Sequence, residues 1–85
     1  MDKRDANEKE IVRFFRQCGC VVIRQDRHAG FDLLVIDRDT CYVVEIKHTH
    51  EQLSLTVNEQ ILQAEIGKMY HIITSVEEAA ELIGR

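Results

Sequence analysis

The chain has 85 residues, a formal net charge of −4 and a hydrophobic fraction of 45%, which fits one small domain over residues 1–85 and excludes a second core. No apolar run approaches the roughly 20 residues of a membrane span, and the N-terminus lacks an apolar signal segment, so we expect a cytoplasmic protein without membrane contact. The acidic balance argues against general electrostatic attraction to nucleic acid, but not against an acidic site that recruits a divalent cation.

The first half of the chain predicts a helix followed by three strands. Asp5 and Glu8 have the spacing of a capping box, and apolar residues follow at helical intervals until Gly19. Short runs rich in β-branched residues predict strands over residues 20–24, 31–36 and 41–47. The last two strands should form a hairpin around a turn over residues 37–40.

The second half predicts a helix, a strand and a final helix. Thr56 and Glu59 repeat the capping-box spacing and should begin a helix that ends near Gly67. Residues 69–73 read as a fourth strand. Ser75 and Glu78 open a third helix, which should stop at Gly84.

The element order is therefore α-β-β-β-α-β-α, which predicts an α/β fold. The second and third strands are apolar on both faces, so helices should cover both sides of the sheet. The connection from the third strand to the fourth is long enough for a right-handed parallel crossover. We expect a three-layer α/β/α sandwich with a mixed four-stranded sheet.

Three charged residues stand at the ends of the two most apolar strands. Asp32 begins the apolar run of the second strand, and Glu45 and Lys47 close that of the third. Charged side chains are rarely buried unless they are paired or hold an ion, because removing a charge from water is costly. These three residues therefore need a physical explanation.

The hairpin register predicts that the two acids meet. A turn centred on Arg38 and Asp39 places Asp32 directly opposite Glu45, with Cβ atoms roughly 4.5–5.5 Å apart. Two carboxylates at that separation can bind one divalent cation. Lys47 is two residues beyond Glu45 and so points to the same face, where it can orient a water or stabilise a phosphate oxygen.

An internal salt bridge at the sheet edge is the alternative explanation. It accounts for a glutamate and a lysine, but less well for a second acid across the hairpin, because two facing carboxylates repel each other. Glu8 lies on the apolar stripe of the first helix and is therefore turned toward the sheet, unless it serves as the capping-box partner of Asp5.

With these residues in place, the chain resembles the PD-(D/E)XK nuclease superfamily, and most of all the small stand-alone VRR-NUC domains of phages and bacteria. The resemblance rests on a leading helix with an acid (Glu8), on Gly30-Phe31-Asp32 and Glu45-Ile46-Lys47, and on the order of the elements. Phe31 stands where the superfamily's name has a proline. The resemblance implies a restriction endonuclease-like fold.

The resemblance also implies a role for each matching residue. Asp32, Glu45 and the backbone carbonyl of Ile46 would bind Mg²⁺ or Mn²⁺, while Lys47 would orient or help deprotonate the attacking water. Glu8 would support a second metal or the position of Lys47. The candidate contacts to nucleic acid are Arg24, Arg27, His28 and His48. In the helix after the third strand, Gln60 and Gln63 are candidates to face the site, and Glu59 is either a third candidate or only a capping residue.

The function expected from this reading is a metal-dependent DNA endonuclease acting on duplex or branched DNA. An 85-residue domain offers little surface for reading bases, which favours recognition of DNA structure, such as a branch or junction. Cutting two strands calls for two sites and hence a homodimer. The alternatives are a catalytically silent nucleic-acid-binding or regulatory module, and a nuclease subunit active only within a larger assembly.

Overall fold

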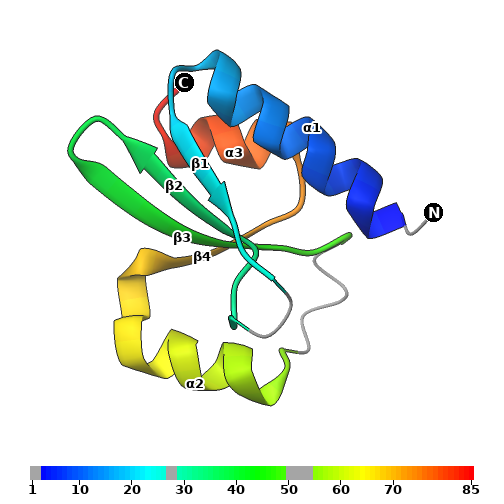
Figure 1. Cartoon of the computed structure of the whole chain (residues 1–85), viewed down its shortest axis with the longest axis vertical. Helices are drawn as coiled ribbons and strands as arrows, with labels where there is room; N and C mark the ends of the chain where they lie inside the picture. The colour runs from blue at the N-terminus through cyan, green and yellow to red at the C-terminus, as the bar shows by residue number, and fades with distance from the viewer. Residues whose placement is uncertain (1–2, 27–28, 50–54) are drawn as a thin grey trace.

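The computed structural model has the predicted order of elements (Figure 1) and describes residues 3–26, 29–49 and 55–85. Arg27 and His28, two of the predicted DNA contacts, lie outside the described residues. The elements are α1 (Lys3–Gln17), β1 (Val21–Arg24), β2 (Leu33–Asp37), β3 (Thr40–Ile46), α2 (Val57–Ile66), the 3₁₀ helix η1 (Gly67–Met69), β4 (Tyr70–Ile73) and α3 (Val76–Leu82). No helix in these described ranges is both long enough and apolar enough to cross a membrane.

The sheet is mixed, as predicted, with the strand order β1-β2-β3-β4. The first three strands are antiparallel, and β4 pairs with β3 in parallel after the crossover through α2. In the hairpin Leu33 lies opposite Val44, which is the register expected for a turn at Arg38 and Asp39. Arg38 adopts a positive φ of 58° in this turn.

Two predicted boundaries are wrong at positions that matter for the acids. The first helix already includes Lys3, so Asp5 lies inside α1 rather than at its cap. The second strand begins at Leu33 rather than Phe31, and Asp32 precedes it in a bend. The backbone N–H of Asp32 bonds the carbonyl of Val44 at 3.0 Å, one residue out of the strand register, so regular pairing stops there.

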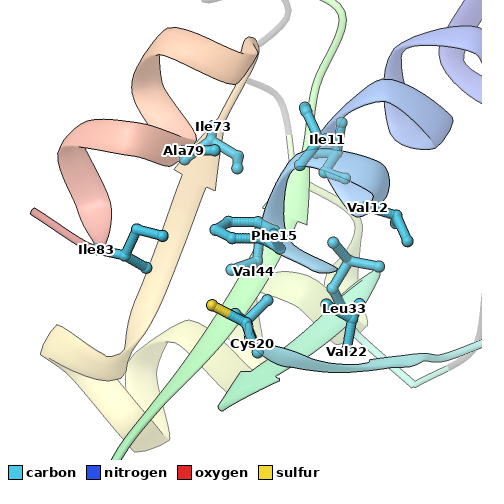
Figure 2. Close-up of a cluster of buried hydrophobic side chains, with 12 residues drawn as sticks. Ile11, Val12, Phe15, Cys20, Val22, Leu33, Val44, Ile73, Ala79 and Ile83 are labelled. Atoms are coloured by element: carbon cyan, nitrogen blue, oxygen red, sulfur yellow. The ribbon is translucent and has the colours of Figure 1, made fainter. Parts of the chain in front are cut away.

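The main core lies between the sheet and the pair of helices α1 and α3 (Figure 2). Phe15 and Ile11 from α1 are fully buried against Val44 of β3 and Ile73 of β4. Because side chains alternate along a strand, Val44 and Ile46 face this core, and Glu45 therefore faces the opposite layer, where α2 lies. The sandwich has three layers, as predicted, and β3 supplies apolar side chains to the core on one side and the Glu45 carboxyl to the α2 side.

The segment before Asp32 is held tightly against the start of α2. Gly30 has a φ of +87°, and a Cβ at this position would lie 3.1 Å from the carbonyl oxygen of Asn58. The hydroxyl of Tyr70 donates a buried hydrogen bond of 2.9 Å to the carbonyl of Gly30. Gly30 is thus required both by its backbone conformation and by the close approach of the helix.

Gly30→Ala should destabilise the protein by about 1–2 kcal/mol more than Gly19→Ala, as measured by urea unfolding. Gly19 is a matched control, because it has the same φ of +87° but nothing within 4 Å of its Cβ position. The difference between the two variants therefore isolates the contact with Asn58. Equal losses for the two variants would show that the approach of α2 is not tight.

A candidate active site beside the third strand

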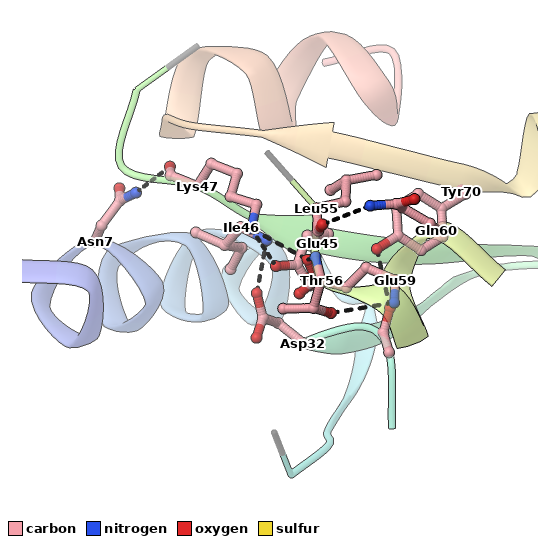
Figure 3. A network of polar contacts seen from close by, with 11 residues as sticks. Asn7, Asp32, Glu45, Ile46, Lys47, Leu55, Thr56, Glu59, Gln60 and Tyr70 are labelled. Atoms are coloured by element: carbon pink, nitrogen blue, oxygen red, sulfur yellow. Dashed lines mark hydrogen bonds and ion pairs between the residues drawn. The ribbon is translucent and has the colours of Figure 1, made fainter. Parts of the chain in front are cut away.

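The predicted acids and lysine converge on the face of the sheet that α2 covers (Figure 3). Asp32 comes from the bend before β2, Glu45 from β3, and Lys47 from the residue just after β3. A fourth charged residue, Glu59, joins them from the first turn of α2. Asp32, Glu45 and Glu59 are all buried, with at most 7% of each residue exposed.

Asp32 contacts β3 through its side chain as well as through its backbone N–H. Its Oδ2 accepts a buried hydrogen bond of 2.7 Å from the backbone N–H of Ile46. Aspartate side chains commonly replace a backbone partner in this way where regular structure ends. The bond fixes the Asp32 carboxylate beside Glu45 although Asp32 is outside the strand.

Glu45 is the most buried charged group among the described residues, with 1% of its surface exposed. Neither carboxyl oxygen has a hydrogen bond of good geometry to a described residue, and Lys47 Nζ contacts Oε2 at 3.3 Å. Burial raises the pKa of Glu45 to about 9, helped by the neighbouring Glu59 carboxylate and by the charge of Asp32, while Lys47 opposes the shift. Without a cation, this group is therefore protonated near neutral pH.

Lys47 lies between two acids. Its Nζ is 3.3 Å from Glu45 Oε2 and 3.3 Å from Glu59 Oε1. Its backbone is fixed on both sides, because its N–H donates to Ile73 at 3.0 Å and its carbonyl accepts from Asn7 Nδ2 at 3.1 Å. The ammonium group is thus positioned by α1, β4 and α2 together.

Glu59 serves both of the roles that the sequence left open. It completes the predicted capping box, accepting from Thr56 N–H at 2.9 Å while its own N–H donates to Thr56 Oγ1 at 3.2 Å. The same Oε1 contacts Lys47. Burial alone would raise the pKa of Glu59, but the neighbouring Glu45 carboxyl, the bond from the Thr56 N–H and the charge of Lys47 hold it below its usual value.

The two glutamines of α2 do not join this group. Gln60 donates from Nε2 to the carbonyl of Leu55 at 2.9 Å, and Gln63 is exposed. Glu59 is therefore the residue of the second helix that contacts Lys47. Its capping spacing was visible in the sequence, but nothing in that spacing indicated a second contact.

Glu8 faces the sheet, as one of its two predicted orientations required, but it pairs with Arg24. Arg24 Nε donates to Glu8 Oε2 at 3.1 Å, and its Nη2 forms an ion pair with the same oxygen. Within the described residues, no group of three or more acidic, histidine or cysteine side chains is arranged to hold a metal ion. In this structure the Glu8 carboxylate is therefore engaged by Arg24, and the Arg24 guanidinium group is bound to an acid.

The chemistry of the buried acids suits a hard divalent cation. Glu45 presents two buried carboxyl oxygens without hydrogen bonds, and Asp32 stands next to it with a carboxylate fixed by the Ile46 amide. Mg²⁺ and Mn²⁺ prefer oxygen ligands, and Mg²⁺ is often held by only one or two carboxylates while it keeps several waters. The donor set therefore fits such an ion.

A mixed four-stranded sheet between helices, with an acid before the second strand and Glu-x-Lys at the end of the third, defines a protein of the PD-(D/E)XK nuclease type. Residues 1–75 match the model of a family described as archaeal Holliday junction resolvase (hjc), and the chain belongs to this family of nucleases. Among curated proteins and among solved structures, nothing matches the chain.

The raised pKa of Glu45 predicts an unusual pH dependence of stability in the presence of a metal chelator. The folded protein keeps a proton on Glu45 that the unfolded chain releases, so stability should fall as the pH rises from about 4.5 to about 9. Glu45→Gln should remove this loss and make the protein more stable than wild type by on the order of 2 kcal/mol at pH 8. Urea unfolding across the pH range measures both effects.

Glu65→Gln is the matched control, because Glu65 is an exposed glutamate of α2. This variant should follow the wild-type curve. A Glu45→Gln protein whose stability declines with pH as steeply as wild type would contradict the assignment of the effect to the buried carboxyl.

Proposed function

We propose that this protein is a divalent-metal-dependent endonuclease that hydrolyses phosphodiester bonds in branched DNA, a four-way junction being the substrate named by its family. The observation that carries the proposal is the buried Glu45 carboxyl, which lies beside Asp32 and in contact with Lys47. A finer likeness to the VRR-NUC domains of phages and bacteria stays a prediction, as does the cytoplasmic location.

The residues that would hold Mg²⁺ or Mn²⁺ are Asp32, Glu45 and the backbone carbonyl of Ile46. When bound, such an ion polarises a phosphoryl oxygen and lowers the pKa of a coordinated water. The bond between Asp32 and the Ile46 N–H keeps the carboxylate and this stretch of backbone together. Burial of Glu45 keeps bulk water away from its oxygens, which strengthens their attraction for a cation.

Lys47 would act on the water and on the phosphate. In hydrolysis a water oxygen bonds to phosphorus, one phosphorus–oxygen bond to a sugar breaks, and the leaving oxygen gains a proton. An ammonium group fixed between Glu45 and Glu59 can orient the attacking water and stabilise negative charge on the phosphate. The backbone contacts to Asn7 and Ile73 hold the lysine in place for this role.

Arg24 and Glu8 would change partners when DNA binds. Arg24 is half-exposed, with 47% of its side chain accessible, so a phosphate can compete with Glu8 for its guanidinium group. A phosphate on Arg24 would release the Glu8 carboxylate for a second metal or for support of Lys47. His48 is exposed directly after Lys47 and would add a further contact to the backbone of DNA.

Lys47→Ala should reduce cleavage of a labelled four-way junction with Mn²⁺ by at least about 100-fold, because the variant loses the group that orients water and stabilises charge. Gel analysis of the products measures the rate. Lys68→Ala, which removes an exposed lysine of η1, should cleave like wild type. Full activity of Lys47→Ala would refute the proposed mechanism.

Titration with Mn²⁺ in a calorimeter separates the proposal from its alternatives. Binding that Glu45→Gln abolishes supports a nuclease site. Absence of binding at millimolar metal would favour a silent nucleic-acid-binding or regulatory module. Metal binding with cleavage only after a partner protein is added would indicate a subunit of a larger assembly.

The homodimer that two-strand cleavage requires would form on the α2 side of the molecule. Among the residues that the structure describes, the large apolar side chains with the greatest exposure lie in the α2 layer or on the sheet face toward it: Val21 (56%), Ile23 (43%), Val57 (71%), Ile61 (53%) and Met69 (47%). On β1, Val22 is buried in the core, so its neighbours face the α2 side. Exposed apolar surface of this kind is typical of protein–protein contacts.

Ile61→Glu should convert the dimer to a monomer in analytical ultracentrifugation, because it places a charge within the proposed contact. Glu81→Ala, on an exposed position of α3 in the opposite layer, should leave the dimer intact. An Ile61→Glu protein that sediments as wild type would place the contact elsewhere.

A further inference from the structure

A surface hollow of about 540 Å³ lies between α1 and the junction of β4 with α3, away from the buried acids. One wall is a single stripe of α1, formed by Asn7, Glu10, Phe14 and Gln17, whose spacings of three, four and three residues place them on one helix face. The other wall is the connection from β4 to α3, beside which α1 runs in Figure 1. The hollow is large enough for a nucleoside.

The hollow shares a wall with the candidate active site. Asn7, at one end of it, holds the carbonyl of Lys47 through a hydrogen bond of 3.1 Å (Figure 3). His48, the next residue along the chain, also lines the hollow. One end of the hollow is therefore next to the backbone of Lys47, whereas the Lys47 ammonium group points to the α2 side of the sheet. A DNA strand that crosses the end of β3 from the α2 side can then place a nucleotide at this opening.

The charges of the hollow do not favour a phosphate. Arg13 is balanced by Glu10 and Glu77, which also line it. At the start of α3, Glu78 N–H already donates to Ser75 Oγ at 3.2 Å, and Thr74 N–H donates to Glu78 Oε1 at 2.8 Å. An anion bound in the hollow would therefore lie near the carboxylates of Glu10 and Glu77.

The hollow instead offers what a nucleobase requires. Phe14 presents a half-buried aromatic ring, and bases stack on such rings with little regard to sequence. Gln17 has an amide that both donates and accepts hydrogen bonds, and Arg13 has a planar guanidinium group. Unpaired bases are recognised by this combination of stacking and edge contacts.

We propose that this hollow receives one unpaired nucleobase of the DNA strand that is cleaved at Lys47. The inference rests on the proposed nuclease function and adds to it a preference for branch points at which a base is unpaired. Moving a base out of its stack costs least where it is already mismatched or unpaired. Binding of the unpaired base in the hollow therefore strengthens binding of DNA that has a local pairing defect next to the site of hydrolysis.

The test uses metal-free protein in a chelator, so that binding is measured without cleavage. One four-way junction carries a single unpaired 2-aminopurine nucleotide at the branch, a second carries an abasic nucleotide there, and a third is fully paired. Wild type should bind the first about tenfold more tightly than the second, with quenching of the 2-aminopurine fluorescence. Phe14→Leu should abolish both the preference and the quenching, whereas Phe14→Tyr should retain them.

Gln17→Ala is a second variant, at an exposed position where folding is not at risk, and it should reduce the preference without changing binding of the fully paired junction. Glu81→Ala is the control and should behave as wild type. Equal binding of the abasic and base-containing junctions by wild type would overturn the inference while leaving the nuclease proposal intact. Failure to bind any of the three junctions would count against both.

Discussion

The burial of the Glu45 carboxyl group is the constraint on which the rest of the site depends. The fold removes this acid from water without giving its oxygens hydrogen-bond partners among the described residues, and such a group is costly unless it is neutralised. A proton, the ammonium group of Lys47 and a divalent cation are the three means of neutralising it. The free protein uses the first two. An arrangement that is unfavourable for stability alone is typical of a functional site.

The third strand makes this burial possible because it serves two layers at once. Val44 and Ile46 hold β3 against the core of α1 and α3, and Glu45 between them is carried into the opposite layer by the alternation of the strand. The parallel crossover then brings α2 over the same face, and with it Glu59. Apolar packing on one side of the sheet thus supplies the energy that holds charged groups together on the other side.

Much of this arrangement follows from the sequence, because it depends on local patterns. The hairpin register and the capping box of α2 rest on alternation and on spacings of a few residues. The departure of Asp32 from its strand was not predictable, since it arises from a side-chain bond to Ile46, 14 residues away. The pairing of Glu8 with Arg24 likewise joins residues 16 apart, which no periodic pattern records.

Position 59 illustrates how narrowly one residue of the site is defined. Its carboxylate accepts from the Thr56 N–H to begin α2 and at the same time balances the charge of Lys47. Aspartate is one methylene shorter and so is less able to make both contacts, and glutamine keeps the acceptor but loses the charge. Glutamate is therefore the natural amino acid best suited to this position, and we expect natural variation there to be among the most restricted in the chain. One side chain both caps the start of α2 and balances the charge of Lys47, so a substitution at this position has to preserve both contacts.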